Sequence, residues 1–283
     1  MQIFHNIKEL QESLQACRKD GKTIALVPTM GNLHDGHLSL VNIAKEHADI
    51  VVASIFVNPT QFGVGEDFDS YPRTLDEDCA KLQSVACDMV FAPSVDEMYP
   101  TYPPQIQVLS GEITKILCGQ TRPTHFDGVG LVVSKLFNIV RPDVAMFGKK
   151  DYQQLAIIRK LNDELNFGIK IIGGEIVRAD SGLALSSRNG YLTADELAIA
   201  PRLHQALGDF ADELRADFNV SRLSELTQKY RDRINASGFT VDYLEVLTDG
   251  LTPPSDQDKN LVILTASYLG KARLLDNIEI HLT

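Results

Sequence analysis

The sequence predicts an α/β protein in which a doubly wound parallel sheet is followed by a smaller α+β domain. Over the first 177 residues, apolar runs alternate with segments of helical periodicity, as they do in βαβ units. The run 49–57 is almost continuously apolar, which favours a strand covered on both faces. Beyond residue 177, helical segments come first and strands follow. We therefore expect a Rossmann-like domain at 1–178 and a C-terminal α+β domain at 179–283.

Each element of the first domain is predicted from its periodicity and from the turn residues that flank it. Parallel strands need right-handed crossovers, so the connecting helices should pack on the sheet. The proline-rich stretch 99–104 predicts a loop. In chain order we expect a helix at 7–17, strands at 22–28 and 49–57 on either side of a helix at 39–47, a helix at 75–85, short strands at 88–92 and 105–109, a helix at 126–140, a strand at 143–147, a helix ending near 166 and a strand at 169–177.

The second domain begins after the polar, glycine-bearing segment 178–189, which we interpret as a hinge. Thr193 and Glu196 have the spacing of a capping box, which predicts a helix start. This helix should run to about residue 214. The remaining elements expected are a helix at 220–236 and strands at 241–247, 261–267 and 273–275.

Composition argues against several classes of protein. The chain has 283 residues, a net charge of −11 and no basic cluster, which argues against a nucleic-acid partner. Its start lacks the basic-then-apolar form of a signal peptide, and no apolar run approaches the ~20 residues that span a membrane. Four scattered cysteines without a C-x-x-C pair predict reduced thiols. We therefore expect a cytoplasmic protein without a membrane partner.

The stretch from Val27 to His37 is the strongest indication of function. A buried strand is expected before it, glycines lie within it, and a helix is expected after it. In α/β proteins this arrangement holds phosphates, because a helix N-terminus offers unpaired N–H groups. His34 and His37 should face the same side of the first helical turn. Their spacing alone also allows a structural role or metal ligation, but the glycine context favours phosphate binding.

Polar residues at other strand ends and loops are candidates to complete a nucleotide site. Gly148–Asp151 joins a strand end to a helix start, although a charged first helical turn explains it equally well. Leu185–Asn189 offers hydroxyls, a guanidinium and an amide to phosphate oxygens, although a polar linker would have the same composition. Gln61, and one of Gln153 and Gln154, are neutral amides suited to the hydroxyls and carboxylate of a small substrate.

Six motifs occur in a fixed order along the first two-thirds of the chain: Pro28–His37, Phe56–Phe62, Tyr71–Thr74, Arg122–Val129, Phe147–Leu155 and Gly182–Leu192. Together they resemble the pantothenate synthetase (pantoate–β-alanine ligase) family, within the H-x-G-H nucleotidylyltransferase and class I aminoacyl-tRNA synthetase superfamily. The stretch Leu269–Asn277 is compatible with the same family. Two departures are Lys149, where the family commonly has an acidic or neutral residue, and Thr124, where it commonly has glycine.

The resemblance implies a two-step reaction of the coenzyme A pathway. ATP and pantoate would form pantoyl adenylate and pyrophosphate, and the amine of β-alanine would then displace AMP to give pantothenate. A carboxylate is a poor acyl donor because its leaving group is oxide, and adenylation supplies a better one. Such an enzyme needs positioning and charge stabilisation rather than a covalent nucleophile.

The resemblance also implies roles for individual residues, with His37 the proton donor to the departing pyrophosphate. The implied catalytic residues are His37, His34, Lys150 and Arg188. The implied ATP-binding residues are Met30, Gly31, Asn32, Leu33, His34, Asp35, Gly36, His37, Gly148, Lys149, Lys150, Asp151, Val177, Leu185, Ser186, Ser187 and Arg188.

The substrates, the metal and the assembly are implied in the same way. Gln61 and Gln154 would hold pantoate, with Gln61 also facing β-alanine. Mg²⁺ would accompany the ATP phosphates, with no protein ligand assigned and with Glu77 and Asp78 as outer-shell helpers. The C-terminal domain would act as a lid, and the protein would form a homodimer.

Two other functions are compatible with the same fold. A nucleotidylyltransferase would stop after nucleotide transfer to another small substrate, but Gln61 and Gln154 argue against it. A non-catalytic nucleotide-binding protein would keep the pocket without turnover, but the joint presence of His37, Lys150 and Arg188 argues against that.

Overall fold

The computed structural model describes residues 1–63, 65–66 and 68–282, and the chain divides into two compact units. The first unit comprises Met1–Lys149 and Gln153–Glu175, and the second comprises Lys150–Tyr152 and the chain from Ile176 onward. Within the described ranges, no helix has both the length and the apolar character that a membrane crossing requires. The four cysteines are free thiols, as predicted.

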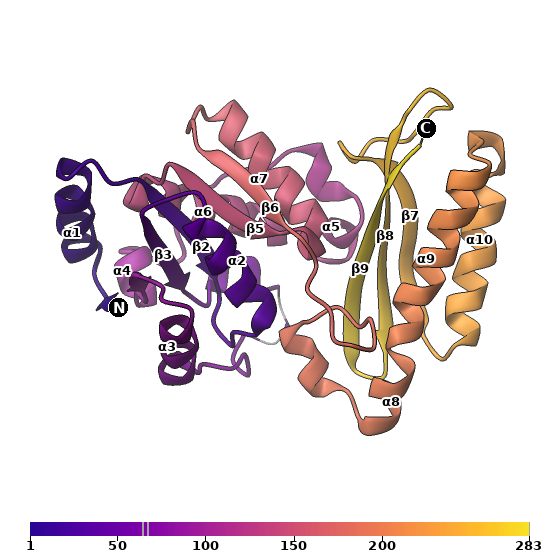
Figure 1. Cartoon of the computed structure of the whole chain (residues 1–283), viewed down its shortest axis with the longest axis horizontal. Helices are drawn as coiled ribbons and strands as arrows, with labels where there is room; N and C mark the ends of the chain where they lie inside the picture. The colour runs from indigo at the N-terminus through magenta and orange to yellow at the C-terminus, as the bar shows by residue number, and fades with distance from the viewer. Residues whose placement is uncertain (64, 67, 283) are drawn as a thin grey trace. The chain divides into compact units, whose positions relative to one another are not determined.

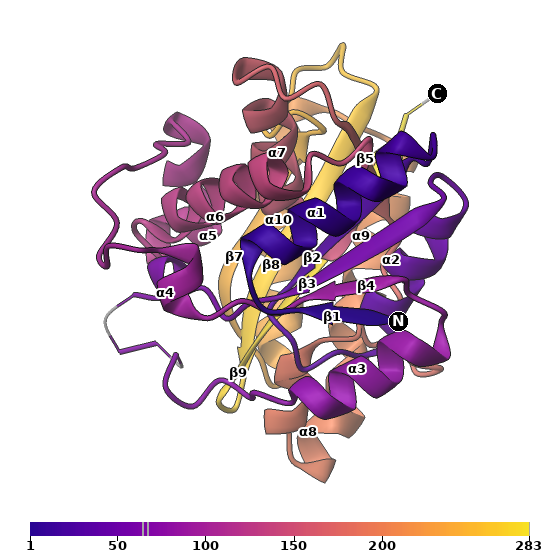
Figure 2. The ribbon, with the colours of Figure 1, turned by 90° about the vertical axis from the view of Figure 1, so that its left-hand side faces the viewer.

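The first unit is built on a parallel sheet whose strand order is β1-β4-β3-β2-β5-β6. Figure 1 labels β3, β2, β5 and β6, and Figure 2 labels β1 and β4. Strands β2 and β3 are buried along nearly their whole length, in keeping with their continuous apolar sequence. The strands are β1 (Gln2–Phe4), β2 (Ile24–Thr29), β3 (Ile50–Ile55), β4 (Met89–Phe91), β5 (Val144–Gly148) and β6 (Lys170–Gly174).

Helices cover both faces of this sheet, which confirms the predicted doubly wound fold. Figure 2 shows α2 and α3 on one side of the strands, with α1, α6 and α7 on the other. Leu40 and Val41 of α2 and Leu82 of α3 pack on buried side chains of β2, β3 and β5. The helices are α1 (Ile7–Lys19), α2 (Asp35–Lys45), α3 (Leu75–Ser84), α4 (Val95–Met98), α5 (Cys118–Thr121), α6 (His125–Val140) and α7 (Tyr152–Glu164), with single 3₁₀ turns η1 (Pro59–Gln61), η2 (Glu112–Lys115) and η3 (Lys149–Asp151).

The strand order reverses between β2 and β5. These strands are neighbours, yet the helices that follow them, α2 and α7, pack on opposite faces (Figure 2). In open α/β sheets, ligands bind outside the carboxyl ends of the strands at such a switch point. The stretch after Thr29 and the stretch after Gly148 both leave the sheet there.

The second unit is an α+β unit with an antiparallel sheet of order β7-β8-β9. Helices α9 and α10 lie along one face of this sheet (Figure 1), and their apolar residues form its core. Phe210 of α9 and Tyr230 of α10 stack with ring centroids 4.5 Å apart. The elements are η4 (Ser187–Tyr191), α8 (Ala194–Ile199), α9 (Pro201–Ala216), α10 (Val220–Ala236), β7 (Thr240–Thr248), β8 (Asn260–Leu269) and β9 (Ala272–His281).

Several predicted boundaries were wrong for identifiable reasons. The strand expected at 105–109 is irregular, and Ile106 and Leu109 are exposed. The helix expected from residue 193 to 214 is two helices, because Pro201 lacks an N–H and its ring opposes a preceding helical turn. The last strand extends well beyond the predicted 273–275. Asp276 and Asn277 interrupt the apolar run in the sequence, which made the strand look shorter, but both residues are buried within it.

Two further differences concern the phosphate-type segments. Helix α2 begins at Asp35 rather than near Ser39, because His34 caps it. Strand β6 ends at Gly174 rather than at 177, since the Val177 carbonyl accepts a hydrogen bond from the Leu185 N–H instead (2.9 Å).

Candidate active site

His34 and His37 form the N-terminal cap of α2. The Gly36 N–H donates to His34 Nδ1 (3.1 Å), and the His34 N–H donates to His37 Nδ1 (3.3 Å). The two ring centroids are 4.1 Å apart. Because both Nδ1 atoms accept hydrogen bonds, a neutral ring carries its proton on Nε2. The cap therefore gives each imidazole an Nε2–H donor beside the positive end of a helix.

Asp78 of α3 holds the turn that precedes this helix. Its carboxylate is fully buried and accepts the N–H groups of Asn32 (2.8 Å) and Leu33 (2.7 Å). One turn along α3, Lys81 Nζ donates to the Leu33 carbonyl (2.7 Å). At Gly31, where φ is +83°, a Cβ would lie 3.0 Å from Asp78 Oδ2. The turn thus requires glycine at position 31. It is fixed by Asp78, which we expected only as an outer-shell helper, and by Lys81, for which the sequence predicted no role.

Gln61 lies in η1, in the loop that follows β3, and is buried. Its Nε2 donates to Met30 Sδ at 2.9 Å, and its Oε1 accepts from Asn58 Nδ2 at 3.1 Å. The structure therefore brings a predicted substrate residue, Gln61, against a predicted nucleotide residue, Met30. Gly128 of α6 lets the helix pack closely against η1, since a Cβ there would clash with the Thr60 carbonyl at 2.2 Å.

Asn58 fixes the geometry of this loop from the core. It is 1 % exposed, and its Nδ2 also donates to the Gly128 carbonyl (3.1 Å). The Tyr99 hydroxyl donates to Asn58 Oδ1 at 2.9 Å. Burial raises the pKa of Tyr99 to about 12, so this hydroxyl keeps its proton at neutral pH.

Arg122 and His125 support the other side of Gln61. Arg122 makes two contacts of 2.6 Å with the Glu66 carboxylate, and its hydrogen bonds lower the pKa of Glu66 below the usual value. Arg122 Nη1 lies 3.1 Å from His125 Nε2, and His125 Nδ1 lies 2.7 Å from the Gln61 carbonyl. The backbone of Gln61 is therefore held in place as well as its side chain.

The two glutamines of α7 differ in their surroundings. Gln153 is buried, accepts the Cys118 N–H (3.1 Å) and donates to the carbonyls of Ile113 and Ile116 (both 2.8 Å). It therefore closes a structural loop, whereas Gln154 is only half-buried. Of the two, Gln154 is the one with access to a ligand.

The segment after β5 carries two lysines with different ion-pair partners. Lys149 Nζ lies 2.5 Å from Glu175 Oε1, within the first unit. Lys150 Nζ lies 3.4 Å from Asp151 Oδ2, and its side chain is 18 % exposed. Lys150 belongs by its contacts to the second unit.

The predicted phosphate loop in the second unit is a short capped turn. Ser186 precedes η4, and its Oγ accepts the Arg188 N–H (3.3 Å). The Leu185 N–H donates to the Val177 carbonyl, so Val177, a predicted ATP-binding residue, is directly joined to the predicted phosphate loop. In the described parts of the chain, no three His, Cys, Asp or Glu side chains form a group that could hold a metal ion.

The sequence of this chain matches one protein family over almost its whole length. The family model described as pantoate–β-alanine ligase matches residues 2–279. The chain belongs to this ligase family. Among the relatives are pantothenate synthetases from Psychrobacter arcticus, 61 % identical over 279 residues (97 % of this chain, 96 % of the relative), and from Acinetobacter baylyi, 51 % identical over 282 residues (100 % and 99 %).

Solved structures of the ligase family have the same fold. A pantothenate synthetase from Thermus thermophilus is 39 % identical, with a TM-score of 0.89 over 99 % of this chain and 100 % of that chain. A pantoate–β-alanine ligase from Francisella tularensis, complexed with β-γ ATP and β-alanine, is 37 % identical, with a TM-score of 0.78 (98 % and 97 %). These matches confirm the family resemblance and the fold class expected from the sequence.

The structure gives a physical setting for the two departures from the ligase-family pattern. Thr124 has φ 70°, a left-handed conformation that disfavours a β-branched residue and suits the glycine common in the family. Lys149 pairs with Glu175, an exposed residue of the same unit, which offsets its charge locally.

Three supporting residues were not placed by sequence reasoning. Asn58 lies inside a quoted motif but was assigned no role, Asp78 was only an outer-shell candidate, and Lys81 was not considered. A sequence signal did exist for the last two, because their i, i+3 spacing in the helix that begins at Leu75 places both on one face of α3. Their partners are backbone groups about 45 residues away, which no local pattern reveals.

Proposed function

We propose that this chain condenses (R)-pantoate with β-alanine in an ATP-dependent reaction, giving pantothenate, AMP and pyrophosphate. Family membership supports this activity, as does the Francisella relative named for its complex with an ATP species and β-alanine. The structural observation that carries the proposal is the pair of imidazoles that the helix cap fixes at the N-terminus of α2, at the switch point of the sheet.

The first step would be adenylation of pantoate. A pantoate carboxylate oxygen attacks the α-phosphorus of ATP, and the bond from that phosphorus to the β-bridging oxygen breaks. Negative charge then grows on the departing pyrophosphate, where preorganised N–H donors are most effective. We assign this role to His34 and His37, with His37 donating the proton, and propose that Lys150 and Arg188 stabilise the same charge.

The second step would be aminolysis of the adenylate. The amine of β-alanine attacks the acyl carbon, the bond to the AMP oxygen breaks, and the nitrogen loses a proton. The protein needs only to hold amine and acyl group in contact. We propose that Gln61 and Gln154 hold pantoate and that Gln61 also faces β-alanine, which fits the tight anchoring of Gln61 by Asn58 and Met30.

The metal ion, the location and assembly of the protein, the roles of its two domains and its other ATP contacts are also proposals. Mg²⁺ usually binds phosphates with few protein ligands, so we propose that it accompanies the triphosphate of ATP. We propose a cytoplasmic homodimer, with residues 1–178 binding nucleotide and pantoate and residues 179–283 acting as a lid. The proposed ATP contacts are Met30 to His37, Gly148 to Asp151, Val177 and Leu185 to Arg188.

Pyrophosphate exchange tests the proposed activity. With ATP, Mg²⁺ and labelled pyrophosphate, label should enter ATP only when pantoate is present, and β-alanine should trigger release of AMP. Exchange without pantoate would indicate a nucleotidylyltransferase with another substrate. ATP binding without any exchange would indicate a non-catalytic nucleotide-binding protein.

A further inference from the structure

Asp276 and Asn277 are adjacent polar residues in the middle of β9, and each is only 4 % exposed. They lie in the Leu269–Asn277 stretch, to which the proposed function assigns no role. The register of β9 against β8 is regular here, so the two side chains leave opposite faces of the strand. Buried polar groups need partners, and the partners of this pair identify what the strand holds.

Asp276 holds Arg178 in a two-pronged ion pair. Arg178 Nη1 and Nη2 donate to Oδ2 and Oδ1 of Asp276, both at 2.8 Å, and Nη1 also donates to the Gly182 carbonyl (3.1 Å). The Asn277 N–H completes the set at Asp276 Oδ1 (2.8 Å). His204 Nδ1 lies farther away, 3.5 Å from Oδ2. This fork geometry fixes the orientation of both groups, because two parallel N–H bonds allow little rotation.

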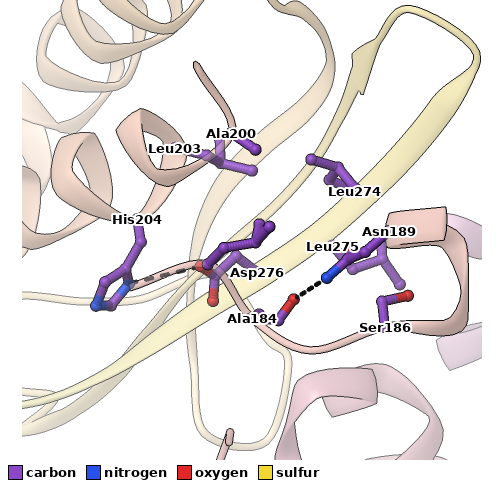
Figure 3. Close-up of a pocket in the computed structure, with 10 residues that line it drawn as sticks. Ala184, Ser186, Asn189, Ala200, Leu203, His204, Leu274, Leu275 and Asp276 are labelled. Carbon is purple, nitrogen blue, oxygen red and sulfur yellow. Dashed lines mark hydrogen bonds and ion pairs between the residues drawn. The ribbon is translucent and has the colours of Figure 1, made fainter. Parts of the chain in front are cut away.

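Arg178 lies in the hairpin that leads to the predicted phosphate loop. Residues 177–185 are closed by hydrogen bonds from Ala179 N–H to the Leu183 carbonyl (2.9 Å) and from Leu185 N–H to the Val177 carbonyl (2.9 Å). Asn189 Nδ2 then donates to the Ala184 carbonyl (3.0 Å). In Figure 3, Asp276 lies between His204 and the segment that carries Ala184, Ser186 and Asn189. Fixing Arg178 therefore fixes the segment that carries Ser186–Arg188.

Asn277 holds the other predicted phosphate segment. Its Nδ2 donates to the Lys150 carbonyl at 3.0 Å. Two residues later, the Tyr152 hydroxyl lies 3.4 Å from the Asp249 carbonyl, beyond the end of β7. These contacts explain why Lys150–Tyr152 groups with the second unit, although most of α7 belongs to the first.

We infer that Asp276 and Asn277 are positioning residues for adenylation, which fix the Ser186–Arg188 segment and Lys150 from opposite faces of β9. This inference rests on the proposed function, in which both segments contact ATP phosphates. Small displacements of charge-stabilising donors are costly, because a shift of about 1 Å can lower a rate by about 100-fold. Neither residue touches substrate in this role.

The test uses Asp276→Asn and a matched control in the same sheet, Asp242→Asn. Asp242 of β7 pairs with Arg273 of β9 (2.7 Å), and both partners are largely buried. We expect Asp276→Asn to speed amide hydrogen exchange across 178–190 by about tenfold or more, since a broken anchor frees the local fold. We expect kcat for pantoate-dependent pyrophosphate exchange to fall about 10- to 100-fold, with KM for pantoate changing less than about threefold.

Two further variants keep the test decisive. Arg178→Lys keeps the charge but loses the two-pronged geometry, so it should show the effects of Asp276→Asn in weaker form. It replaces Asp276→Asn in the test if that variant does not fold. Asn277→Leu should speed exchange at the amides of 149–152 and lower kcat in the same assay. Asp242→Asn should leave two quantities within about twofold of wild type: the amide hydrogen exchange rates at 178–190 and 149–152, and kcat for pyrophosphate exchange.

Each outcome decides one part of the inference. Amide exchange in Asp276→Asn, Arg178→Lys and Asn277→Leu no faster than in Asp242→Asn would overturn the anchoring. Faster exchange with kcat equal to that of Asp242→Asn would overturn the role in adenylation. A wild-type protein without pantoate-dependent exchange would overturn the proposed function and that role together, while the amide exchange would still decide the anchoring.

Discussion

At the scale of single residues, the two histidines owe their chemistry to the helix cap. Backbone N–H groups occupy both Nδ1 atoms, so the neutral rings are held with the proton on Nε2. Two surface histidines at the same spacing would be free to exchange tautomers and rotamers. The cap therefore makes the rings suitable as fixed donors.

Replacing His37 by Ala should lower the rate of adenylation by about 100-fold or more while changing ATP affinity by less than about threefold. The reason is that the donor acts on charge that appears only in the transition state. Pyrophosphate exchange and calorimetric ATP binding measure the two quantities. His47→Ala, a change at an exposed histidine near the other end of α2, is the control. Equal losses in rate and affinity would show uniform binding instead.

Asp78→Asn should lower the free energy of unfolding by about 2–3 kcal/mol, because a buried acceptor for two backbone N–H groups is lost. The same variant should slow adenylation, since the turn before α2 loses its anchor. Urea unfolding and pyrophosphate exchange measure these effects. Asp76→Asn, an exposed change in the first turn of the same helix, should alter neither. An Asp78 variant as stable as the Asp76 variant would contradict this role.

At the scale of elements, the sequence predicted most of the helices and strands but not their ends. Elements with long apolar runs, such as β3 and α6, were predicted well because burial on several sides leaves a clear pattern. The apolar residues at 105–109 were misassigned, since an apolar run without a partner strand forms no sheet. The strand β1 was missed because it begins with the polar Gln2 and its Ile3 is exposed, so it lacks the continuous apolar run that marks β4, a strand of the same length.

The N-terminal end of α6 offers a direct test of local strain. Thr124 caps it at φ 70°, and no side-chain capping bond compensates. Thr124→Gly should raise the free energy of unfolding by about 1 kcal/mol, because relief of about 1–2 kcal/mol of strain exceeds the entropic cost of glycine. Thermal unfolding measures the change. A Thr124→Ala variant should gain less, and a lower melting temperature for the glycine variant would contradict the strain argument.

At the scale of the whole molecule, the sequence predicted the candidate site by its motifs but not by its supports. The contact of Met30 with Gln61 joins two motifs that the sequence places 31 residues apart. The ion pair between Asp276 and Arg178 joins residues 98 positions apart in the sequence. The hydrogen bond from Asn277 to the Lys150 carbonyl joins residues 127 positions apart. Hydropathy patterns predict local secondary structure from neighbouring residues. They do not predict which distant polar residues pair, so these contacts are visible only in the folded structure.

The Asp276 pair should also be visible in the acid stability of the protein. Burial alone would raise the pKa of Asp276, but His204 at 3.5 Å and the paired hydrogen bonds from Arg178 lower it below the ordinary value of 3.8. A lowered carboxyl pKa contributes stability that is complete above pH 3.8 and is lost as pH falls through the folded-state pKa. In urea unfolding, the stability gap between wild type and Asp276→Asn should therefore narrow below about pH 4. A gap that stays constant with pH would contradict this.

The central claim is that pantoate is activated as an adenylate in this protein. It is tested most directly by running the complete reaction with pantoate labelled by ¹⁸O in its carboxylate, followed by mass spectrometry of the products. Attack of a carboxylate oxygen on the α-phosphorus leaves that oxygen with the phosphate, so AMP should carry one ¹⁸O and pyrophosphate none. Label in inorganic phosphate, or AMP without label, would contradict the account.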